Sequence, residues 1–284
     1  MKTYQIAKTS HKDLFRVIDR EGEWQWYWHK GEKKFLRSVN YILEEGYSKG
    51  VRFYEYLKNN SKEETDRILR EAGERGDRIH QAIFLLLRDG TIDRNTQVLA
   101  EDNKTPVNLS NDEWDCLLAF GEFWNRHDCK LIVKEYAVFN LTQEYAGTTD
   151  GVLIMKKNCG IDTCKCDNFI GQVGLFDWKS GGAIYESYGP QVAAYASCDN
   201  LPKKIEYTAI LRIGSRHKKT GGYELKIYDI EETIAHAKEF IAAIVIQDAH
   251  YEPFDESMIR EIPDSINIIA RKKNGKRLRN SQEI

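Results

Sequence analysis

The segment QVGLFDWKS carries two charged side chains, Asp177 and Lys179, at the end of an apolar run. Residues i and i+2 of a strand point to the same side of a sheet, so the two charges are expected to project together while Trp178 points the other way. Because isolated charges are costly to bury, this pattern is typical of a site at a sheet edge. The pair alone is equally consistent with an exposed ion pair where the strand ends.

A second carboxylate, Asp150, occurs in the preceding predicted strand, within GTTDGVLIM. If the two strands pair as a hairpin, Asp150 and Asp177 can lie across from each other. Two carboxylates that close repel unless a proton or a cation lies between them. Mg²⁺ prefers such oxygen ligands and meets phosphate substrates while it keeps several waters. The two strands therefore indicate a site for a divalent cation.

Other polar side chains can reach the same place. Glu135, within KEYAVFN, is on the strand before and can point toward the same edge. His80 follows Gly76 by one helical turn, and the small residue would let that helix approach a neighbour closely. Gln191 and Tyr195 share one face of the helix predicted after the third strand. A lone helical histidine is commonly structural or solvated, so His80 is informative only together with the others.

With GDRIH, the strand of Glu135, GTTDGV, DWKS and QVAAY in this order, the chain resembles the PD-(D/E)XK nuclease superfamily. The motifs are similar to those of the RecB-type exonuclease branch, which includes CRISPR adaptation-associated nucleases, mitochondrial genome-maintenance exonucleases and many phage proteins. The resemblance extends over about residues 36 to 215 and includes the opening LRSVNYILEEG. It depends on several spaced motifs, because a D-x-K pair alone is not specific.

The resemblance implies metal-dependent cleavage of a phosphodiester bond. It implies that His80, Asp150 and Asp177 bind Mg²⁺ or Mn²⁺, together with the backbone carbonyl of Trp178. Lys179 would position or deprotonate the attacking water. These roles agree with general chemistry, because a cation lowers the pKa of bound water and an ammonium stabilises developing negative charge.

Three further residues have supporting roles by the same resemblance. Glu135 could bind a second metal, while Gln191 and Tyr195 would orient the lysine or hold the DNA strand. The implied enzyme is a Mg²⁺-dependent exonuclease that acts on single strands or DNA ends in recombination, repair or replication, with a helicase or recombination protein as partner. A structure-selective endonuclease and a DNA-binding module that no longer cuts are the alternatives.

The connection between the two aspartate strands, residues 156 to 171, is longer than a tight hairpin and carries Cys159, Cys164 and Cys166. Their C-x4-C-x-C spacing lacks the C-x2-C pair of a typical zinc site and offers no obvious fourth ligand. Reduced thiols are therefore favoured over Zn²⁺. Some RecB-type relatives bind a 4Fe-4S cluster through one cysteine before the core and three near the C-terminus. The cysteines here do not follow that pattern, so no such cluster is expected.

DNA binding requires basic groups near the acidic site. One candidate group lies between two late predicted strands: Arg212, Arg216, Lys218 and Lys219. The other is the tail RKKNGKRLR, for which a solvated segment is the favoured interpretation. Near the N-terminus, Trp24, Trp26 and Trp28 alternate as on one face of a strand. They could stack on unpaired bases or form a packed aromatic face.

The elements that position these residues can be located along the chain. Capping boxes at Ser61/Glu64 and Ser110/Glu113 predict two helix starts, and the first helix continues to Gly90. The segment TQVLAEDNKTPVNL between the helices is interpreted as a polar connector. Strands are expected at 129–140, 144–155, 172–180, 203–213 and 221–230, and later helices at 190–198 and 231–251.

This order predicts an α/β fold with a restriction-endonuclease-like core, in which helices flank a central mixed sheet and the first three core strands form a meander. An N-terminal helical and β extension, residues 1–60, would pack on a core at 61–250, and a basic tail would follow at 251–284. The 284 residues are 41% hydrophobic and 30% charged, with a net charge of −2. This balance argues against binding nucleic acid by bulk charge but allows a local basic groove.

Localisation follows from what the sequence lacks. It has no signal peptide, and no apolar run approaches the roughly 20 residues that span a bilayer. We therefore expect a cytoplasmic protein, encoded by a bacterium or a phage, with no membrane partner.

Overall fold

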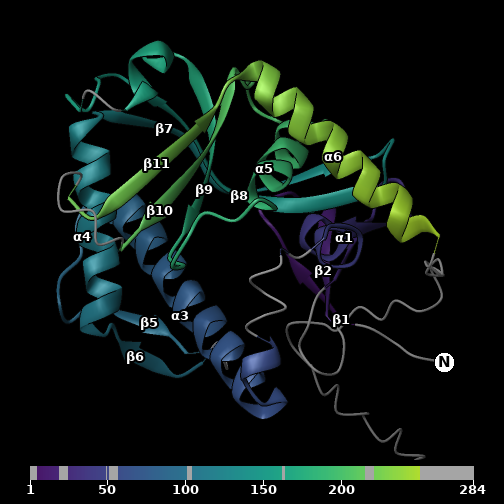
Figure 1. The fold of residues 1–284 in the computed structure, drawn as a ribbon, viewed down its shortest axis with the longest axis horizontal. Coiled ribbons are helices and arrows are strands. Elements are labelled where there is room, and N and C mark those ends of the chain that lie inside the picture. Colours follow the sequence, from purple (N-terminus) through teal and green to yellow (C-terminus); the bar gives the residue numbers. More distant parts are fainter. Residues whose placement is uncertain are drawn as a thin grey trace, which may run out of the picture.

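The computed structural model describes residues 5–18, 25–48, 50, 57–100, 104–161, 164–214 and 221–249. A mixed sheet of nine strands crosses this part of the chain, with helices on both faces (Figure 1). Its strands are β1 (Gln5–Lys8), β2 (Leu14–Ile18), β3 (Trp26–His29), β4 (Lys34–Ser38), β7 (Cys129–Asn140), β8 (Tyr145–Met155), β9 (Val173–Lys179), β10 (Tyr207–Ile213) and β11 (Tyr223–Tyr228). The predicted α/β class, with a mixed sheet flanked by helices, is confirmed.

The sheet is organised around β8. β7 pairs with β8 antiparallel along its whole length, while the other edge of β8 is shared by β4 and β9. The β9 pairing is antiparallel, so β7, β8 and β9 form the predicted meander. β10 then pairs with β9 in parallel, and β11 pairs antiparallel with β10. A parallel neighbour needs a crossover connection, and the helix α5 (Tyr188–Ala196) provides it between β9 and β10.

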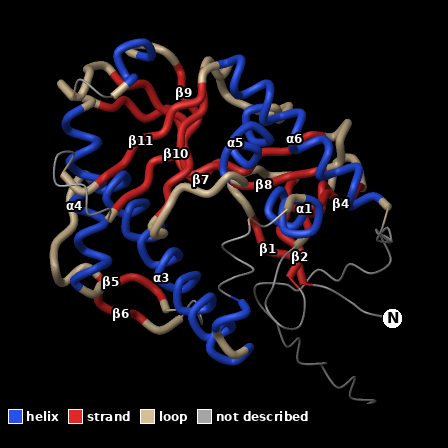
Figure 2. The backbone as a smooth tube through the Cα atoms, in the orientation of Figure 1, coloured by secondary structure: helices blue, strands red, loops and turns tan. Residues whose placement is uncertain are grey.

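Helices cover the two faces of the sheet with separate apolar cores (Figure 2). Besides α5 they are α1 (Val39–Gly46), α3 (Lys62–Asp89), α4 (Asn111–Arg126), the 3₁₀ helix η1 (Lys165–Phe169) and α6 (Ile230–Asp248). α3 and α4 pack on the face that carries Phe176 and Trp178, and α1, α5 and α6 pack against Leu175. Asp177 shares the side of Leu175, as the alternation predicts. Within the described residues, no helix is long and apolar enough to cross a membrane.

Both predicted helix starts are observed. Ser110 and Glu113 form a complete capping box at the start of α4. At the start of α3, Ser61 Oγ accepts a hydrogen bond from the amide of Glu64. The Glu64 carboxylate pairs instead with the arginine one turn later. Gly90 ends α3 in a left-handed conformation, with φ of 77°, which glycine adopts without strain.

The expectation that Gly76 permits a close helix approach is wrong. A Cβ at this position would meet only Ser180 Oγ, at 3.9 Å, which is an ordinary contact. Arg75 joins α3 to the end of β9 instead, because its guanidinium donates to the Ser180 carbonyl at 3.0 Å and contacts Cys116 Sγ at 3.2 Å. An alanine would fit at position 76.

The N-terminal strands belong to the main sheet, because β4 pairs in parallel with the start of β8. Trp26 and Trp28 are buried and pack with Val17 in a small core. The structure therefore favours the packed aromatic face over a base-stacking surface for these two tryptophans. Trp24 and the tail at 251–284 lie outside the described residues, and the predicted boundaries at 60 and 250 stay predictions.

The segment expected to be a polar connector contains a second, two-stranded sheet, so that expectation is wrong. β5 (Gln97–Leu99) pairs antiparallel with β6 (Pro106–Asn108). Strands of three residues are too short to show a clear alternation, which is why the pattern does not predict them. The Gln81 side chain of α3 holds the hairpin by accepting from the amide of Leu99 at 2.8 Å and donating to its carbonyl at 3.2 Å.

Gly147 allows α5 to lie directly on β8, because a Cβ there would be 2.4 Å from Cε1 of Tyr195. Gly147→Ala is therefore expected to displace the Tyr195 ring and to lower the free energy of unfolding by about 1–3 kcal/mol in a denaturant titration. Gly73→Ala is the matched control, since nothing lies within 4 Å of a Cβ at that helical position. It is expected to raise the free energy of unfolding by about 0.5–1 kcal/mol. A Gly147→Ala protein as stable as the wild type would contradict the close packing.

Candidate active site

The pairing of β8 with β9 determines where the two predicted aspartates lie. The last antiparallel pair of this ladder is Gly151 with Phe176, so Asp150 and Asp177 occupy the next position. Gly151 is required at this point because a Cβ would lie 2.9 Å from the Trp178 ring. The predicted adjacency of the two aspartates is thus confirmed.

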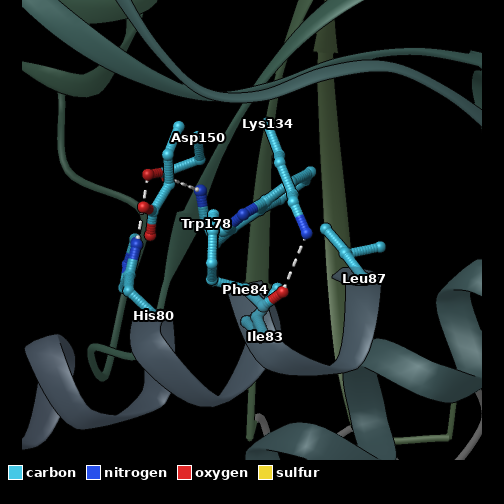
Figure 3. A pocket seen from close by; sticks show the side chains of 8 residues that line it. His80, Ile83, Phe84, Leu87, Lys134, Asp150 and Trp178 are labelled. Atoms are coloured by element: carbon cyan, nitrogen blue, oxygen red, sulfur yellow. Dashed lines mark hydrogen bonds and ion pairs between the residues drawn. The ribbon is translucent and has the colours of Figure 1, made fainter. Parts of the chain in front are cut away.

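Asp150 is held by contacts from two directions (Figure 3). His80, from α3, places Nδ1 3.1 Å from Asp150 Oδ1. The backbone amide of Trp178 donates to Asp150 Oδ2 at 2.6 Å. The first contact joins a helix to the sheet and the second crosses from β8 to β9, so this carboxylate is fixed in orientation.

Asp177 is paired with Lys179, the residue two positions later on the same strand. Lys179 Nζ lies 2.7 Å from Asp177 Oδ2, and the Asp177 side chain is only 5% exposed. The ammonium thus occupies one side of Oδ2, and no other described residue donates to this oxygen. The ammonium also lies over the ring of Tyr188, 4.6 Å from its centroid. A buried carboxylate oxygen therefore has capacity for a further ligand.

Burial and the charges of neighbouring residues shift the pKa values of His80, Asp177 and Lys179. Desolvation raises the pKa of Asp177 to about 6, and the charge of Asp150 adds to it against the attraction of Lys179. Desolvation lowers the pKa of His80, but Asp150 and Asp177 outweigh this effect and raise it to about 9. For Lys179, desolvation is likewise outweighed by the two carboxylates, which raise its pKa. At neutral pH two cations thus balance two crowded carboxylates.

Glu135 lies beside this group, as expected. It lines the same small, open depression as His80 and Asp150. Its neighbours on β7, Lys134 and Tyr136, pair with the residues that flank Asp150, and its own φ is 43°, a left-handed conformation rare for glutamate. Partial desolvation and the charge of Asp150 raise the pKa of Glu135.

Gln191 and Tyr195 are buried on α5, on the face toward the sheet. The Gln191 amide donates to the Tyr195 hydroxyl at 3.2 Å and to Asn40 Oδ1, on α1, at 2.9 Å. Desolvation, with a contribution from the charge of Asp177, raises the pKa of Tyr195. Gln191 and Tyr195 are therefore two uncharged side chains, joined by a hydrogen bond, near the carboxylates.

Sequence reasoning missed several groups at the site, among them Arg16 and Tyr188. Arg16, on β2, donates to Thr148 Oγ1 of β8 at 3.2 Å. Its charge also acts on Glu135 and lowers the pKa of that carboxyl against the effect of desolvation. No local signal in the sequence connects β2 to β8, because their contact depends on how the N-terminal strands join the sheet.

The candidate ligand atoms, one imidazole nitrogen and carboxylate oxygens, are of the kinds that bind divalent cations. Ligands about 2.1 Å from an octahedral ion lie about 3.0 Å apart, close to the 3.1 Å between His80 Nδ1 and Asp150 Oδ1. Asp177 Oδ2 supplies a buried oxygen whose one partner among the described residues is the Lys179 ammonium. A nitrogen ligand beside carboxylates suits Mn²⁺ better than Mg²⁺, whose usual ligands are all oxygens.

The three donor residues lie farther apart than the ligands of one bound ion do. Among the described residues, the ligand atoms of His80, Asp150 and Asp177 do not all lie within 4.8 Å of one another. The physical reason is that carboxylates repel and that Asp177 is directed toward Lys179. Asp177 Oδ2 therefore has to approach the other two donors when a cation binds.

The predicted DNA-binding residues are described only in part. Arg212 is at the end of β10, and its Nε donates to Glu224 Oε2 at 2.7 Å while its Nη1 donates to the Gly182 carbonyl at 3.0 Å. Arg216, Lys218 and Lys219 lie outside the described residues, so their role stays a prediction. Arg212 is thus held by protein groups near the end of β9.

The cysteine segment differs from the sequence-based expectation in one respect. Its thiols do have a fourth candidate ligand nearby, because His127 lies next to Cys159 and Cys166. This histidine is not apparent from the sequence, since His127 belongs to the end of α4 and not to the cysteine segment. The structure therefore adds a candidate fourth ligand that the cysteine spacing alone does not offer.

The His80–Asp150 pair predicts a pH-dependent stability of the metal-free chain. His80 has a folded-state pKa of about 9 against an ordinary value of 6.5. Its stabilising contribution is thus complete below pH 6.5 and is lost as the pH rises through 9. In EDTA, wild type should exceed His80→Gln in free energy of unfolding by about 1–2 kcal/mol at pH 6, after allowance for solvent screening. A difference that stays constant from pH 6 to 10 would contradict this pairing.

The structure thus brings His80, Glu135, Asp150, Asp177 and Lys179 together beside β8 and β9. These are interior strands, so the expectation of a site at a sheet edge is wrong. Gln191 and Tyr195 approach from the helix above it. Neither the models of known protein families nor the curated protein sequences match this chain.

Proposed function

We propose that this chain is a metal-dependent deoxyribonuclease that hydrolyses phosphodiester bonds. The main support is the β8–β9 register, which makes neighbours of Asp150 and Asp177 while His80 contacts the first and Lys179 the second. Crowding these charges costs free energy of folding. Strongly shifted pKa values in a pocket are typical of functional sites, which favours chemistry over a merely structural ion pair.

In this proposal His80 would release its extra proton to solvent and would hold Mn²⁺ or Mg²⁺ together with Asp150 and Asp177. The carbonyl of Trp178 would be a further ligand. A bound cation of this kind polarises a phosphoryl oxygen and lowers the pKa of water. Lys179 keeps its ammonium at the site through Asp177. There it can orient a water molecule and stabilise the negative charge that develops on the phosphate.

The surrounding residues position these groups. Glu135 would bind a second cation at the pocket that it shares with Asp150. Gln191 and Tyr195, joined by a hydrogen bond, would orient the DNA strand or Lys179. DNA with a single-stranded region or a free end remains the proposed substrate, as the motifs imply.

The first experiment is digestion of end-labelled single-stranded and duplex DNA by the full chain in Mn²⁺, in Mg²⁺ and in EDTA. Cleavage with either metal and none in EDTA is the expected result. Failure of the folded protein to cut any DNA would overturn the proposal and favour a non-cutting DNA-binding module, which a gel-shift assay detects.

A second substrate separates the two modes of cutting. A closed single-stranded circle has no end, so an exonuclease leaves it intact while it degrades the same strand after linearisation. We expect the circle to resist. Cleavage of the circle at the rate of the linear form would assign the site to an endonuclease.

A further inference from the structure

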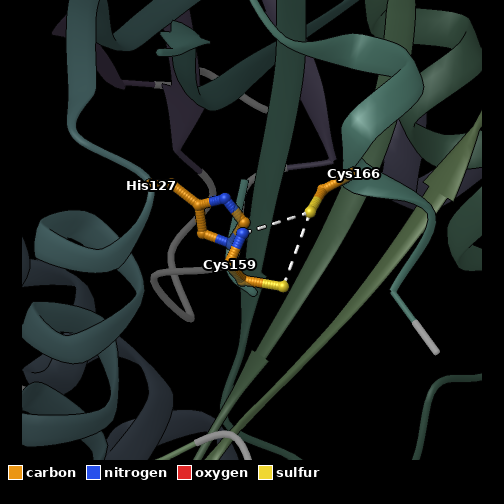
Figure 4. A group of neighbouring side chains, drawn as sticks. All are labelled: His127, Cys159 and Cys166. Atoms are coloured by element: carbon orange, nitrogen blue, oxygen red, sulfur yellow. Dashed lines mark hydrogen bonds between the residues drawn. The ribbon is translucent and has the colours of Figure 1, made fainter. Parts of the chain in front are cut away.

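The second group of interest lies in the cysteine segment, away from the candidate active site. The donor atoms of His127, Cys159 and Cys166 all lie within 4.8 Å of one another, and all three residues are buried (Figure 4). Within the described residues this is the one set of three or more His, Cys, Asp or Glu side chains that meets this spacing. It forms at the connection between β8 and β9.

The spacing of the two thiols is close to that around a tetrahedral ion. Cys166 Sγ is 3.5 Å from Cys159 Sγ. Two thiolates about 2.3 Å from Zn²⁺ lie about 3.8 Å apart at the tetrahedral angle. The thiols therefore need to move only slightly to share one ion.

Cys164 provides a third sulfur. Its thiol is near enough to Cys166 and Cys159 for the three groups to shift one another's pKa, and the interaction with Cys166 lowers the pKa of Cys164. It lies outside the tightest set and has to approach His127 more closely to complete a tetrahedron. Three sulfurs and one imidazole are a common ligand set of structural zinc sites.

The orientation of His127 suits a metal ligand. Its Nδ1 lies 3.1 Å from the carbonyl oxygen of Lys157, so this nitrogen carries the proton and donates. Nε2 then has the free lone pair, and it lies 3.3 Å from the hydroxyl of Tyr223. A ligating histidine whose other nitrogen donates to a backbone carbonyl is a recurrent arrangement at zinc sites. Zinc on Nε2 would replace the Tyr223 contact.

We propose that His127, Cys159, Cys164 and Cys166 bind one Zn²⁺ ion as a structural site. Binding releases the three thiol protons to solvent and leaves three thiolates and one neutral imidazole on the ion. The site does not depend on the proposed nuclease activity. Asp150 precedes the end of β8 by five residues, or about 17 Å of strand, so this zinc is separate from the catalytic cation.

The position of the site means that bound zinc would connect separate segments of the chain. His127 follows α4, and its carbonyl already accepts from the amides of Lys156 and Lys157 at 2.9 and 3.0 Å. Zinc would join the end of α4 to both parts of the connection that leads from β8 into β9. It would thereby hold the two strands that carry Asp150 and Asp177 in register.

The test is the zinc content and zinc affinity of the reduced full chain. One zinc per chain should remain after gel filtration, as measured by elemental mass spectrometry. Cys159→Ser and Cys166→Ser should weaken zinc binding by more than about 100-fold, since even the outer partners of a ligand are worth 10–100-fold. Cys198→Ser is the matched control, because Cys198 is a buried cysteine just after α5, in the core on the other face of the sheet, and it should retain the zinc.

A second measurement covers variants that fail to fold. Co²⁺ added to the metal-free wild type should give the visible spectrum of a tetrahedral thiolate site, and Zn²⁺ should abolish it. A reduced wild type that neither contains zinc nor binds Co²⁺ would overturn the proposal. Equal loss of zinc in Cys198→Ser would overturn it as well.

Discussion

Asp177→Asn is expected to lower the rate of DNA cleavage by about 10³-fold or more, because several kcal/mol of charge stabilisation depend on the carboxylate that holds the cation. The substitution keeps the shape of the side chain and removes its charge. In calorimetry without DNA, Mn²⁺ affinity should fall as well, since one of the predicted ligands becomes a neutral amide.

The same substitution is expected to leave the fold intact. Burial raises the folded-state pKa of Asp177 to about 6 from its ordinary value of 3.8. Its ionisation therefore costs folding free energy as the pH rises above 3.8, and the full cost is present above pH 6. Asparagine carries no charge and therefore removes this cost. The ammonium of Lys179 still interacts with the carboxylate of Asp150. At pH 7.5 the melting temperature of Asp177→Asn should therefore equal or exceed that of wild type.

Asp115→Asn is the control, because Asp115 is an exposed carboxylate on α4. It should preserve both the cleavage rate and the Mn²⁺ affinity. Wild-type activity in a folded Asp177→Asn protein would remove Asp177 from the site and with it the proposed ligand set.

The sequence was sufficient to predict the meander and the meeting of its aspartates. The apolar runs that mark β8 and β9 are a local property of the sequence, and consecutive strands commonly pair with each other. The observed register then places Asp150 next to Asp177. The same local reasoning placed α3 and its Gly90 end within one residue.

Contacts between distant parts of the chain could not be predicted in this way. Arg16 reaches Thr148 only because β4 joins the start of β8. His127 approaches Cys159 and Cys166 because the β8–β9 connection folds back over the end of α4. Sequence spacing carries no information on either approach, since each depends on the packing of separate elements.

The ion pair between Lys179 and Asp177 was predicted as a shared face but not as a direct contact. Alternation in a strand predicts that two side chains project to the same side, but it does not predict the 2.7 Å distance between Lys179 Nζ and Asp177 Oδ2. A cation held by Asp177 would compete with this ammonium. Asp177 would turn from the ammonium toward His80 and Asp150, and the ammonium would face the substrate.

This change makes Lys179→Met a sharper test than the loss of a ligand. Methionine matches the length of the lysine chain and removes the ammonium that Asp177 now faces. The rate of cleavage should fall by about 10²–10³-fold, the usual cost of one group that stabilises developing charge. Mn²⁺ affinity should not fall and is expected to rise, because a cation that competes for Asp177 is gone.

The opposite responses of the two variants distinguish the roles of the residues. Asp177→Asn should lose metal and activity together, whereas Lys179→Met should lose activity and keep metal. Lys130→Met, at an exposed position on β7, controls for loss of positive charge and should change neither. If Lys179→Met binds Mn²⁺ as weakly as Asp177→Asn, then Lys179 supports the fold of the metal site, and a direct role on the phosphate is excluded. If it cleaves DNA at the wild-type rate, the ammonium acts only as the partner of a buried carboxylate.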